Sequence, residues 1–221
     1  MTERSPSDAA RLTSRALLDI KAVNFRPDDP YTFTSGRVSP VYIDCRKIIS
    51  FPKQRSLIID LAVELMRRDI ASLDAVAGGE TAGIPYAAWL ADRLDLPMLY
   101  VRKQPKGFGR MAQIEGDLGA SWRVALVEDL ATDGGSKINF INALRTAGAT
   151  VSDVIVIFHY GIFPQSVATL AAQGVRLHAL ATWRDVIREA RAGGDFSEAV
   201  LAEIDRFLDD PDGWAARRAA R

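Results

Sequence analysis

The stretch from Leu126 to Phe140, LVEDLATDGGSKINF, joins an apolar run and two adjacent acids to a turn rich in glycine and hydroxyl groups. Glycines tolerate backbone conformations that aim several N–H groups into one concavity, and the start of a helix adds partial positive charge. Thr132 and Ser136 would add hydroxyl donors. The pattern predicts a binding loop for a phosphate monoester, with the amides from Ala131 to Ser136 facing the anion.

Three acids accompany this predicted phosphate loop. Glu128 and Asp129 precede the turn, where two carboxylates suit the hydroxyls of a ribose or a magnesium ion reached through water. An ordinary helix start with capping acids is the alternative that this stretch leaves open. Asp133 lies inside the turn, and a carboxylate that faces a phosphate dianion would lower affinity. We therefore expect its side chain to turn away and to cap the helix or meet Lys137.

A second glycine-containing turn, in the sequence AGGET, follows another apolar run. Gly78 and Gly79 allow close backbone approach, so that Glu80 and Thr81 can direct their amides at a diphosphate. A plain tight turn is the alternative interpretation of these residues.

A basic stretch, RKQPKGFG, places Arg102, Lys103 and Lys106 beside two glycines. Cations on a flexible loop can neutralise a leaving diphosphate and then release it. Without the neighbouring motifs, a solvated basic loop would be the preferred interpretation.

The elements that must position these residues alternate regularly from Leu73 onward. Short apolar strands are predicted in DAVAGG, PMLYVRK, RVALVED, VSDVIVIFHY and VRLHALATW, with helices between them. This alternation is typical of an α/β fold with a parallel sheet of about five strands, covered on both faces. Ligands of such sheets bind beyond the carboxyl ends of the strands, which is where the candidate residues lie.

The whole chain, residues 1–221, is interpreted as one domain. Its first helix is predicted from Ser7 to Val23, and the terminal sequence WAARRAAR is expected to fray. The domain is divided into an N-terminal segment (1–50), a core (51–183) and C-terminal helices (184–221).

Composition argues against several classes of protein. Lys and Arg (28) balance Asp and Glu (28), so no global positive field indicates nucleic-acid binding. A single cysteine, Cys45, excludes a disulfide framework within the chain and a cysteine metal cluster. No window approaches the roughly 20 apolar residues of a membrane span, and no signal peptide is recognised. We therefore expect a cytoplasmic protein that binds neither nucleic acid nor membranes.

An apolar strand, an acidic pair and a Thr/Gly/Ser-rich turn that opens a helix resemble the ribose-phosphate signature of type I phosphoribosyltransferases. Three further stretches narrow this resemblance to the orotate phosphoribosyltransferases: SGRVSPVYIDCRK, AGGETAGIPYAAWLADRL and YVRKQPKGFGRMAQIEG. They resemble the N-terminal segment, the diphosphate loop with its helix, and the mobile catalytic loop of that family. The matches occur in the family's order and run from about Ser7 to Trp183.

The resemblance implies a type I phosphoribosyltransferase fold with a small N-terminal hood over the site. It implies transfer of the 5-phosphoribosyl group from 5-phosphoribosyl 1-diphosphate to N1 of orotate, which gives orotidine 5′-phosphate and diphosphate in pyrimidine biosynthesis. Mg²⁺ would bind through the diphosphate and the ribose hydroxyls, with Asp129 as a candidate ligand through water. A homodimer is also implied, in which loop 102–116 reaches toward the partner's site.

The resemblance also implies roles for single residues. Lys106, Arg102 and Asp129 are assigned to catalysis, because the reaction builds positive charge on the ribose ring and negative charge on the diphosphate. Orotate is assigned to Tyr42, Ile43 and Thr132. Binding of 5-phosphoribosyl 1-diphosphate is assigned to Glu80, Thr81, Arg102, Lys103, Lys106, Glu128, Asp129, Leu130, Ala131, Thr132, Asp133, Gly134, Gly135 and Ser136.

Several positions depart from the family's pattern. Phe108 stands where the best-known members carry a loop histidine, and Thr34 and Ala82 stand where lysines are common. The sequence FHYGIF lacks an arginine that could hold the orotate carboxylate, so Arg37 and Arg46 become candidates for that contact.

Three alternatives are weighed against orotate transfer. A phosphoribosyltransferase for another base is disfavoured by SGRVSPVYID, which resembles the orotate enzymes. A non-catalytic regulator that senses phosphoribosyl diphosphate and binds nucleic acid is disfavoured by the balanced charge. A generic doubly wound binding protein leaves the sequence RKQPKGFGR unexplained.

Overall fold

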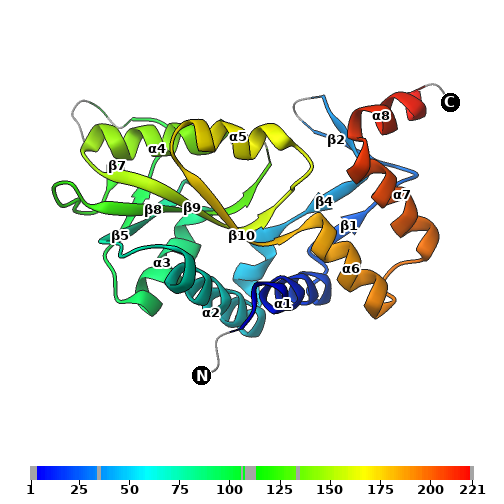
Figure 1. Ribbon diagram of the computed structural model, residues 1–221, viewed down its shortest axis with the longest axis horizontal. Coiled ribbons are helices and arrows are strands. Elements are labelled where there is room, and N and C mark those ends of the chain that lie inside the picture. The colour runs from blue at the N-terminus through cyan, green and yellow to red at the C-terminus, as the bar shows by residue number, and fades with distance from the viewer. Residues whose placement is uncertain (1–3, 34–35, 106, 108–112, 133–134, 220–221) are drawn as a thin grey trace.

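The computed structural model describes residues 4–33, 36–105, 107, 113–132 and 135–219 of the chain. Its centre is a six-stranded sheet in the order β10-β9-β8-β5-β6-β7 (Figure 1). Every pair from β10 to β6 is parallel, whereas β7 pairs antiparallel with β6. The predicted α/β fold with about five parallel strands is therefore confirmed, and a short hairpin strand extends its edge. The strands are Ala75–Gly79 (β5), Met98–Val101 (β6), Ile114–Glu115 (β7), Arg123–Ala131 (β8), Thr150–His159 (β9) and Arg176–Thr182 (β10).

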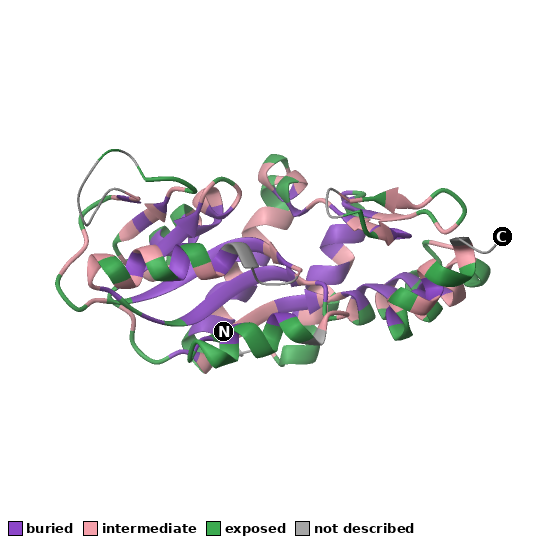
Figure 2. Cartoon of the chain, turned by 90° about the horizontal axis from the view of Figure 1, so that it is seen from above, coloured by how far each residue is buried: buried purple, intermediate pink, exposed green. Residues whose placement is uncertain are grey.

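Helices cover both faces of this sheet because alternate residues of each strand point to opposite sides. Val127 and Ile155 share one apolar core with α1, α2 and α3, whereas Leu126 and Val154 share the other with α4 and α5. Figure 2 shows the central strands buried, while the surrounding helices alternate buried and exposed residues. The helices are Pro6–Asp19 (α1), Pro52–Asp69 (α2), Gly83–Leu94 (α3), Gly135–Ala147 (α4) and Pro164–Ala172 (α5).

The N-terminal part carries two small strand pairs outside the main sheet, and we call residues 23–43 the hood. β1 pairs antiparallel with β4, and β2 pairs antiparallel with β3. The predicted first helix is too long: α1 ends at Asp19, Lys21 adopts a left-handed backbone (φ 54°), and Val23 begins β1. The elements are Val23–Phe25 (β1), Tyr31–Thr32 (β2), Val38–Ser39 (β3) and Val41–Ile43 (β4), followed by the 3-10 helix Cys45–Ser50 (η1).

The C-terminal part forms three helices rather than the two helical segments and frayed tail that the sequence predicts. The tail is helical because Pro211 fits the first turn and Trp214 supplies an apolar anchor, only 4% exposed. The helices are Trp183–Gly193 (α6), Glu198–Asp209 (α7) and Pro211–Ala219 (α8).

The model also bears on the expectation about membranes. Within residues 4–219, gaps aside, no helix combines the length and apolar character that a membrane crossing requires.

Candidate active site

A cavity of about 1630 Å³ is lined by the carboxyl ends of the parallel strands and by the hood. The acidic pair, the AGGET turn, the start of the basic loop and the hood meet there, although they are far apart in sequence. Parallel strands bring this about, because their carboxyl ends lie at the same edge of the sheet. Nine of the predicted site residues line the cavity: Tyr42, Ile43, Glu80, Thr81, Lys103, Glu128, Asp129, Leu130 and Thr132.

Other predicted site residues do not line the cavity or cannot be placed there. Arg102 lies at the base of the basic loop, and Ala131 is buried at the end of β8. Gly135 and Ser136 open α4, as predicted for a loop that leads into a helix. Lys106, Asp133 and Gly134 lie outside the described residues, as do Phe108 and Thr34, so the expected orientation of the Asp133 side chain stays a prediction.

The acidic pair belongs to strand β8 itself, and each carboxylate residue is only 8% exposed. Successive strand residues point to opposite faces, so the two side chains diverge. Glu128 points toward α4, where Phe140 lies. Asp129 points toward η1, where the positive charge of Arg46 acts to lower the pKa of the carboxyl group. The pair therefore presents two separate acceptors to the cavity and is not a chelating pair.

Burial governs the electrostatics of these carboxyl groups. Desolvation, with a smaller contribution from neighbouring Asp129, raises the pKa of Glu128 to about 7 against the attraction of Lys137 and Lys103. Among the described residues, Glu128 Oε1 has no hydrogen-bond partner. Burial also raises the pKa of Asp129, whose Oδ1 accepts the Leu130 N–H at 2.9 Å. A buried acceptor without a partner is costly, and the raised pKa of Glu128, which favours the protonated carboxyl, reflects that cost.

The glycines of the AGGET turn are required by packing within the protein. A Cβ on Gly79 would lie 1.7 Å from Glu128 Oε1, and one on Gly78 would lie 2.7 Å from the backbone of Ile84. On Gly83, a Cβ would lie 2.3 Å from the Val127 carbonyl oxygen. The sequence explained Gly78 and Gly79 by the approach of an anion, but their close neighbours here are protein atoms that bring β5, α3 and β8 together.

The turn after β5 is joined to the base of the basic loop. Glu80 Oε2 accepts a hydrogen bond from the Lys103 N–H at 2.7 Å, and the Glu80 N–H donates to the Val101 carbonyl oxygen at 2.9 Å. The peptide bond between Glu80 and Thr81 is cis. These contacts hold Lys103 beside the predicted diphosphate turn.

Arg102 closes the base of the loop and faces away from the cavity. Its N–H donates to the Gln113 carbonyl at 2.8 Å, and Gln113 Nε2 donates back to the Arg102 carbonyl at 3.1 Å. Its guanidinium lies 3.5 Å from Glu115 Oε1. Arg102 thus stands at the cavity's margin, paired with a carboxylate of β7.

The hood side of the cavity is aromatic and cationic. The rings of Tyr31 and Tyr42 lie 5.2 Å apart, and Arg46 donates to the Tyr42 hydroxyl at 3.1 Å and to Asp44 at 2.8 Å. The Arg37 guanidinium lies 4.3 Å from the centre of the Phe163 ring. Flat apolar surfaces with nearby cations suit a planar anionic ring.

Several cavity residues have no counterpart in the sequence-based assignments. Tyr31, Phe33 and Phe163 are examples, and only the aromatic content of PYTF and GIF could have signalled them. His159 is a structural neighbour: its Nε2 lies 3.0 Å from Ser166 Oγ, which donates to the Phe163 carbonyl at 2.8 Å. Burial lowers the pKa of His159. This histidine therefore braces the segment that carries Phe163.

The described residues contain no group of three or more Asp, Glu, His or Cys side chains arranged to hold a metal ion. A metal held mainly by substrate oxygens needs only one or two protein carboxylates. Asp129, which lines the cavity, is placed to supply one such carboxylate.

Comparisons with known proteins agree with this geometry. No family model matches the chain. It is 55% identical over 214 residues to the orotate phosphoribosyltransferase of Jannaschia sp. (strain CCS1), covering 96% of this chain and 94% of that protein. It is also similar to the crystal structure of orotate phosphoribosyltransferase from Aeropyrum pernix, with a TM-score of 0.72 and 37% identity over 82% of this chain and 99% of that one.

A longer protein contains the same fold. The structure of Leishmania donovani UMP synthase matches 92% of this chain and 43% of its own, with a TM-score of 0.79 and 26% identity. Sequence identity above one half over almost the full length of a relative, together with the shared fold, establishes the relationship. This chain belongs to the orotate phosphoribosyltransferase family.

Proposed function

We propose that this cavity transfers the 5-phosphoribosyl group from 5-phosphoribosyl 1-diphosphate to N1 of orotate, as a step of pyrimidine biosynthesis. The observation that carries the proposal is the meeting of the acidic pair, the AGGET turn, the start of the basic loop (Lys103 and Gln104) and the hood around one cavity. From the sequence, the acidic pair was assigned to the ribose, the AGGET turn and the basic loop to the diphosphate, and the hood to orotate.

The ribose and its 5-phosphate fit the carboxyl end of β8. Glu128 and Asp129 offer separate acceptors to the sugar hydroxyls, and the turn before α4 offers backbone amides and the positive end of a helix to the phosphate. Thr132 lies between these groups and the hood.

The diphosphate fits the side of the cavity formed by Glu80, Thr81 and Lys103. We assign neutralisation of the leaving group to Lys103, Arg102 and Lys106. A cationic loop stabilises the charge that appears on the diphosphate and can then move with it out of the site.

Orotate fits the hood side, against Tyr42 and Ile43, with Thr132 at its edge. Arg37 and Arg46 both line the cavity, and both remain candidates for its carboxylate. Arg46 already donates to Asp44 and Tyr42, so Arg37 is the less committed of the two.

In the reaction, the C1–O bond breaks and diphosphate leaves with the electron pair, while N1 of orotate bonds to C1 and loses its proton. Positive charge builds on the ribose ring, and the Asp129 carboxylate stabilises it. Exclusion of water by the hood and the loop protects the activated sugar from hydrolysis. Mg²⁺, held by substrate oxygens with Asp129 through water, would add charge stabilisation at the diphosphate.

We also propose a cytoplasmic homodimer with loop 102–116 directed toward the partner's site. Support comes from Arg102, which does not line the cavity of its own chain and pairs instead with Glu115 of β7. The fully buried thiol of Cys45 is consistent with a reducing compartment.

An absorbance assay tests the activity directly, by following orotate loss with 5-phosphoribosyl 1-diphosphate and magnesium. We expect turnover with orotate and none with hypoxanthine or adenine. Turnover with a purine alone would replace the substrate assignment. Tight phosphoribosyl-diphosphate binding without turnover of any base would indicate a sensor.

A further inference from the structure

The last helix of the chain contacts the hood. Arg218 donates from its NH1 to the Pro27 carbonyl at 2.8 Å and from its NH2 to the Asp28 carbonyl. On the same helix, Asp212 Oδ1 lies 3.9 Å from Arg37 NH1. Helix α8 contacts β3 of the hood, and Figure 1 shows this last helix near the β2 label although the two elements come from opposite ends of the chain. These contacts join α8 to the loop that leads into β2 and to Arg37, the residue that precedes β3.

The hairpin of the hood has little stability of its own. β2 and β3 are two residues each, and their pairing is continued by the Phe33 N–H, which donates to the Arg37 carbonyl at 2.9 Å. A two-stranded hairpin is marginal in water unless another element packs on it. Yet this hairpin supplies Tyr31, Phe33 and Arg37 to the cavity. Its position over the cavity must therefore be set by outside contacts.

Helix α8 is firmly attached to the preceding helix. Trp214 is buried, its ring lies 5.4 Å from that of Phe207, and its Nε1 donates to Glu203 at 2.6 Å. The contacts combine apolar burial with a satisfied indole N–H. Helix α8 therefore moves with α7.

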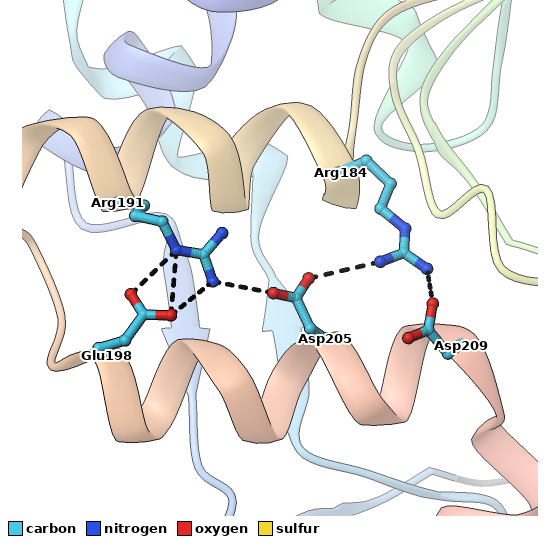
Figure 3. A network of polar contacts seen from close by, with 5 residues as sticks. All are labelled: Arg184, Arg191, Glu198, Asp205 and Asp209. Carbon is cyan, nitrogen blue, oxygen red and sulfur yellow. Dashed lines mark hydrogen bonds and ion pairs between the residues drawn. The ribbon is translucent and has the colours of Figure 1, made fainter.

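Helix α7 is in turn joined to α6. Arg191 contacts Glu198 and Asp205, and Arg184 contacts Asp205 and Asp209, in one network (Figure 3). Shared partners make such a network more rigid than an isolated surface pair.

Helix α6 begins where β10 ends, with Trp183 fully buried. At its far end Asp195 accepts two hydrogen bonds from Arg15 of α1, both at 2.8 Å. We call residues 183–219 the strap, because they connect the main sheet to the hood.

We propose that the strap fixes the hood over the cavity, and that Arg218 is a positioning residue for the substrate bound on the hood side. The inference rests on the proposed function only in naming that substrate as orotate. Arg218 itself does not line the cavity, so it acts through the loop that precedes β2.

The neighbouring residue provides a matched control. Arg217 lies on the same helix and pairs with Asp210 at 3.3 Å, with more than half of its side chain exposed. An alanine at either position removes one arginine from α8, but only Arg218→Ala removes the contacts to the hood. Arg218→Lys keeps a cation that can make one of the two contacts.

The kinetic test separates binding from chemistry. We expect Arg218→Ala to raise KM for orotate about tenfold, the scale of one lost charged hydrogen bond, with kcat and KM for phosphoribosyl diphosphate within about twofold. Arg218→Lys should restore part of the loss, and Arg217→Ala should match the wild type. A uniform loss in all parameters, or an unchanged KM for orotate in Arg218→Ala, would overturn the proposal.

Hydrogen exchange of the substrate-free protein tests the strap independently of catalysis. In Arg218→Ala, a peptide covering Pro27–Phe33 should exchange faster than in the wild type, while peptides from β8 and β9 keep the wild-type rate. In Arg217→Ala, all of these peptides should exchange at the wild-type rate. Unchanged exchange in the hood peptide would refute the strap. If the wild type turned over no base, the proposed function would fail. The exchange measurement would then still show whether or not the strap holds the hood in place.

Discussion

The two sides of the cavity, the carboxyl end of β8 and the hood, differ in how the fold holds them. Glu128 and Asp129 sit in a strand with neighbours on both sides, β5 and β9, and each is 8% exposed. Tyr31 and Thr32 sit in a two-residue strand with one partner. The buried charged groups are thus fixed by the core, whereas the hood groups that we assign to the base are held by a few contacts from elsewhere in the chain.

The largest effect should come from the deeply buried side. Asp129→Asn removes a carboxylate that we assign to the ribose ring charge, and we expect kcat/KM to fall about 100-fold or more. The melting temperature should stay the same or rise, because a desolvated charge is removed at nearly constant shape. Steady-state kinetics and thermal unfolding measure both quantities. Activity within threefold of wild type would show that this side is not the ribose site.

The same side should tolerate no added volume. Gly79→Ala places a methyl group where Glu128 Oε1 lies, and we expect it to lower the free energy of unfolding by about 1–3 kcal/mol. Denaturant unfolding measures this change. Gly174→Ala serves as the control, since its Cβ meets open space and its cost of about 1 kcal/mol comes from the positive φ alone. Equal losses at the two sites would contradict the packing explanation.

The raised pKa of Glu128 gives a pH-dependent effect of known sign. The carboxyl ionises near 4.5 when unfolded and near 7 when folded, so unfolding releases a proton between these values and stability falls as pH rises. We therefore compare the free energy of unfolding of Glu128→Gln with that of the wild type. The difference in favour of the variant should be about 1–3 kcal/mol larger at pH 8 than at pH 5. Unfolding curves of both proteins at the two pH values check this. A difference that is independent of pH would place the folded pKa near its ordinary value.

The smallest effect should come from the hood. Tyr42→Phe removes a hydroxyl that accepts one hydrogen bond from the exposed Arg46 but keeps the ring, so we expect the free energy of unfolding to fall by about 0.5–1.5 kcal/mol at most. Because the ring still packs against the base, kcat/KM for orotate should change by less than about fivefold. A loss as large as that of Asp129→Asn would remove the distinction between the two sides.

Sequence patterns predicted the elements of the site better than their contacts. The acidic pair, the glycine turn and the basic loop were placed at the carboxyl ends of strands, and they do meet in one cavity. The predicted strand RVALVED already contained Glu128 and Asp129, but the pattern did not reveal that β8 continues to Ala131 or which neighbours each of the two side chains meets. Nor did it reveal Arg102 turned toward Glu115, because the orientation of a loop arginine depends on partners outside its own stretch.

By itself, the sequence determined the α/β fold, the identity of the family and the segments that form the site, because periodicity and short motifs are local properties of the chain. Only the tertiary structure decided why Gly79 must be glycine and why residues 214–219 of the C-terminal tail are helical. Gly79 is constrained by a side chain of β8, and Arg218 by carbonyl groups 191 and 190 positions away along the chain. Contacts of that kind leave no local signal, because the residues that make them become neighbours only when the sheet, the hood and the C-terminal helices pack together.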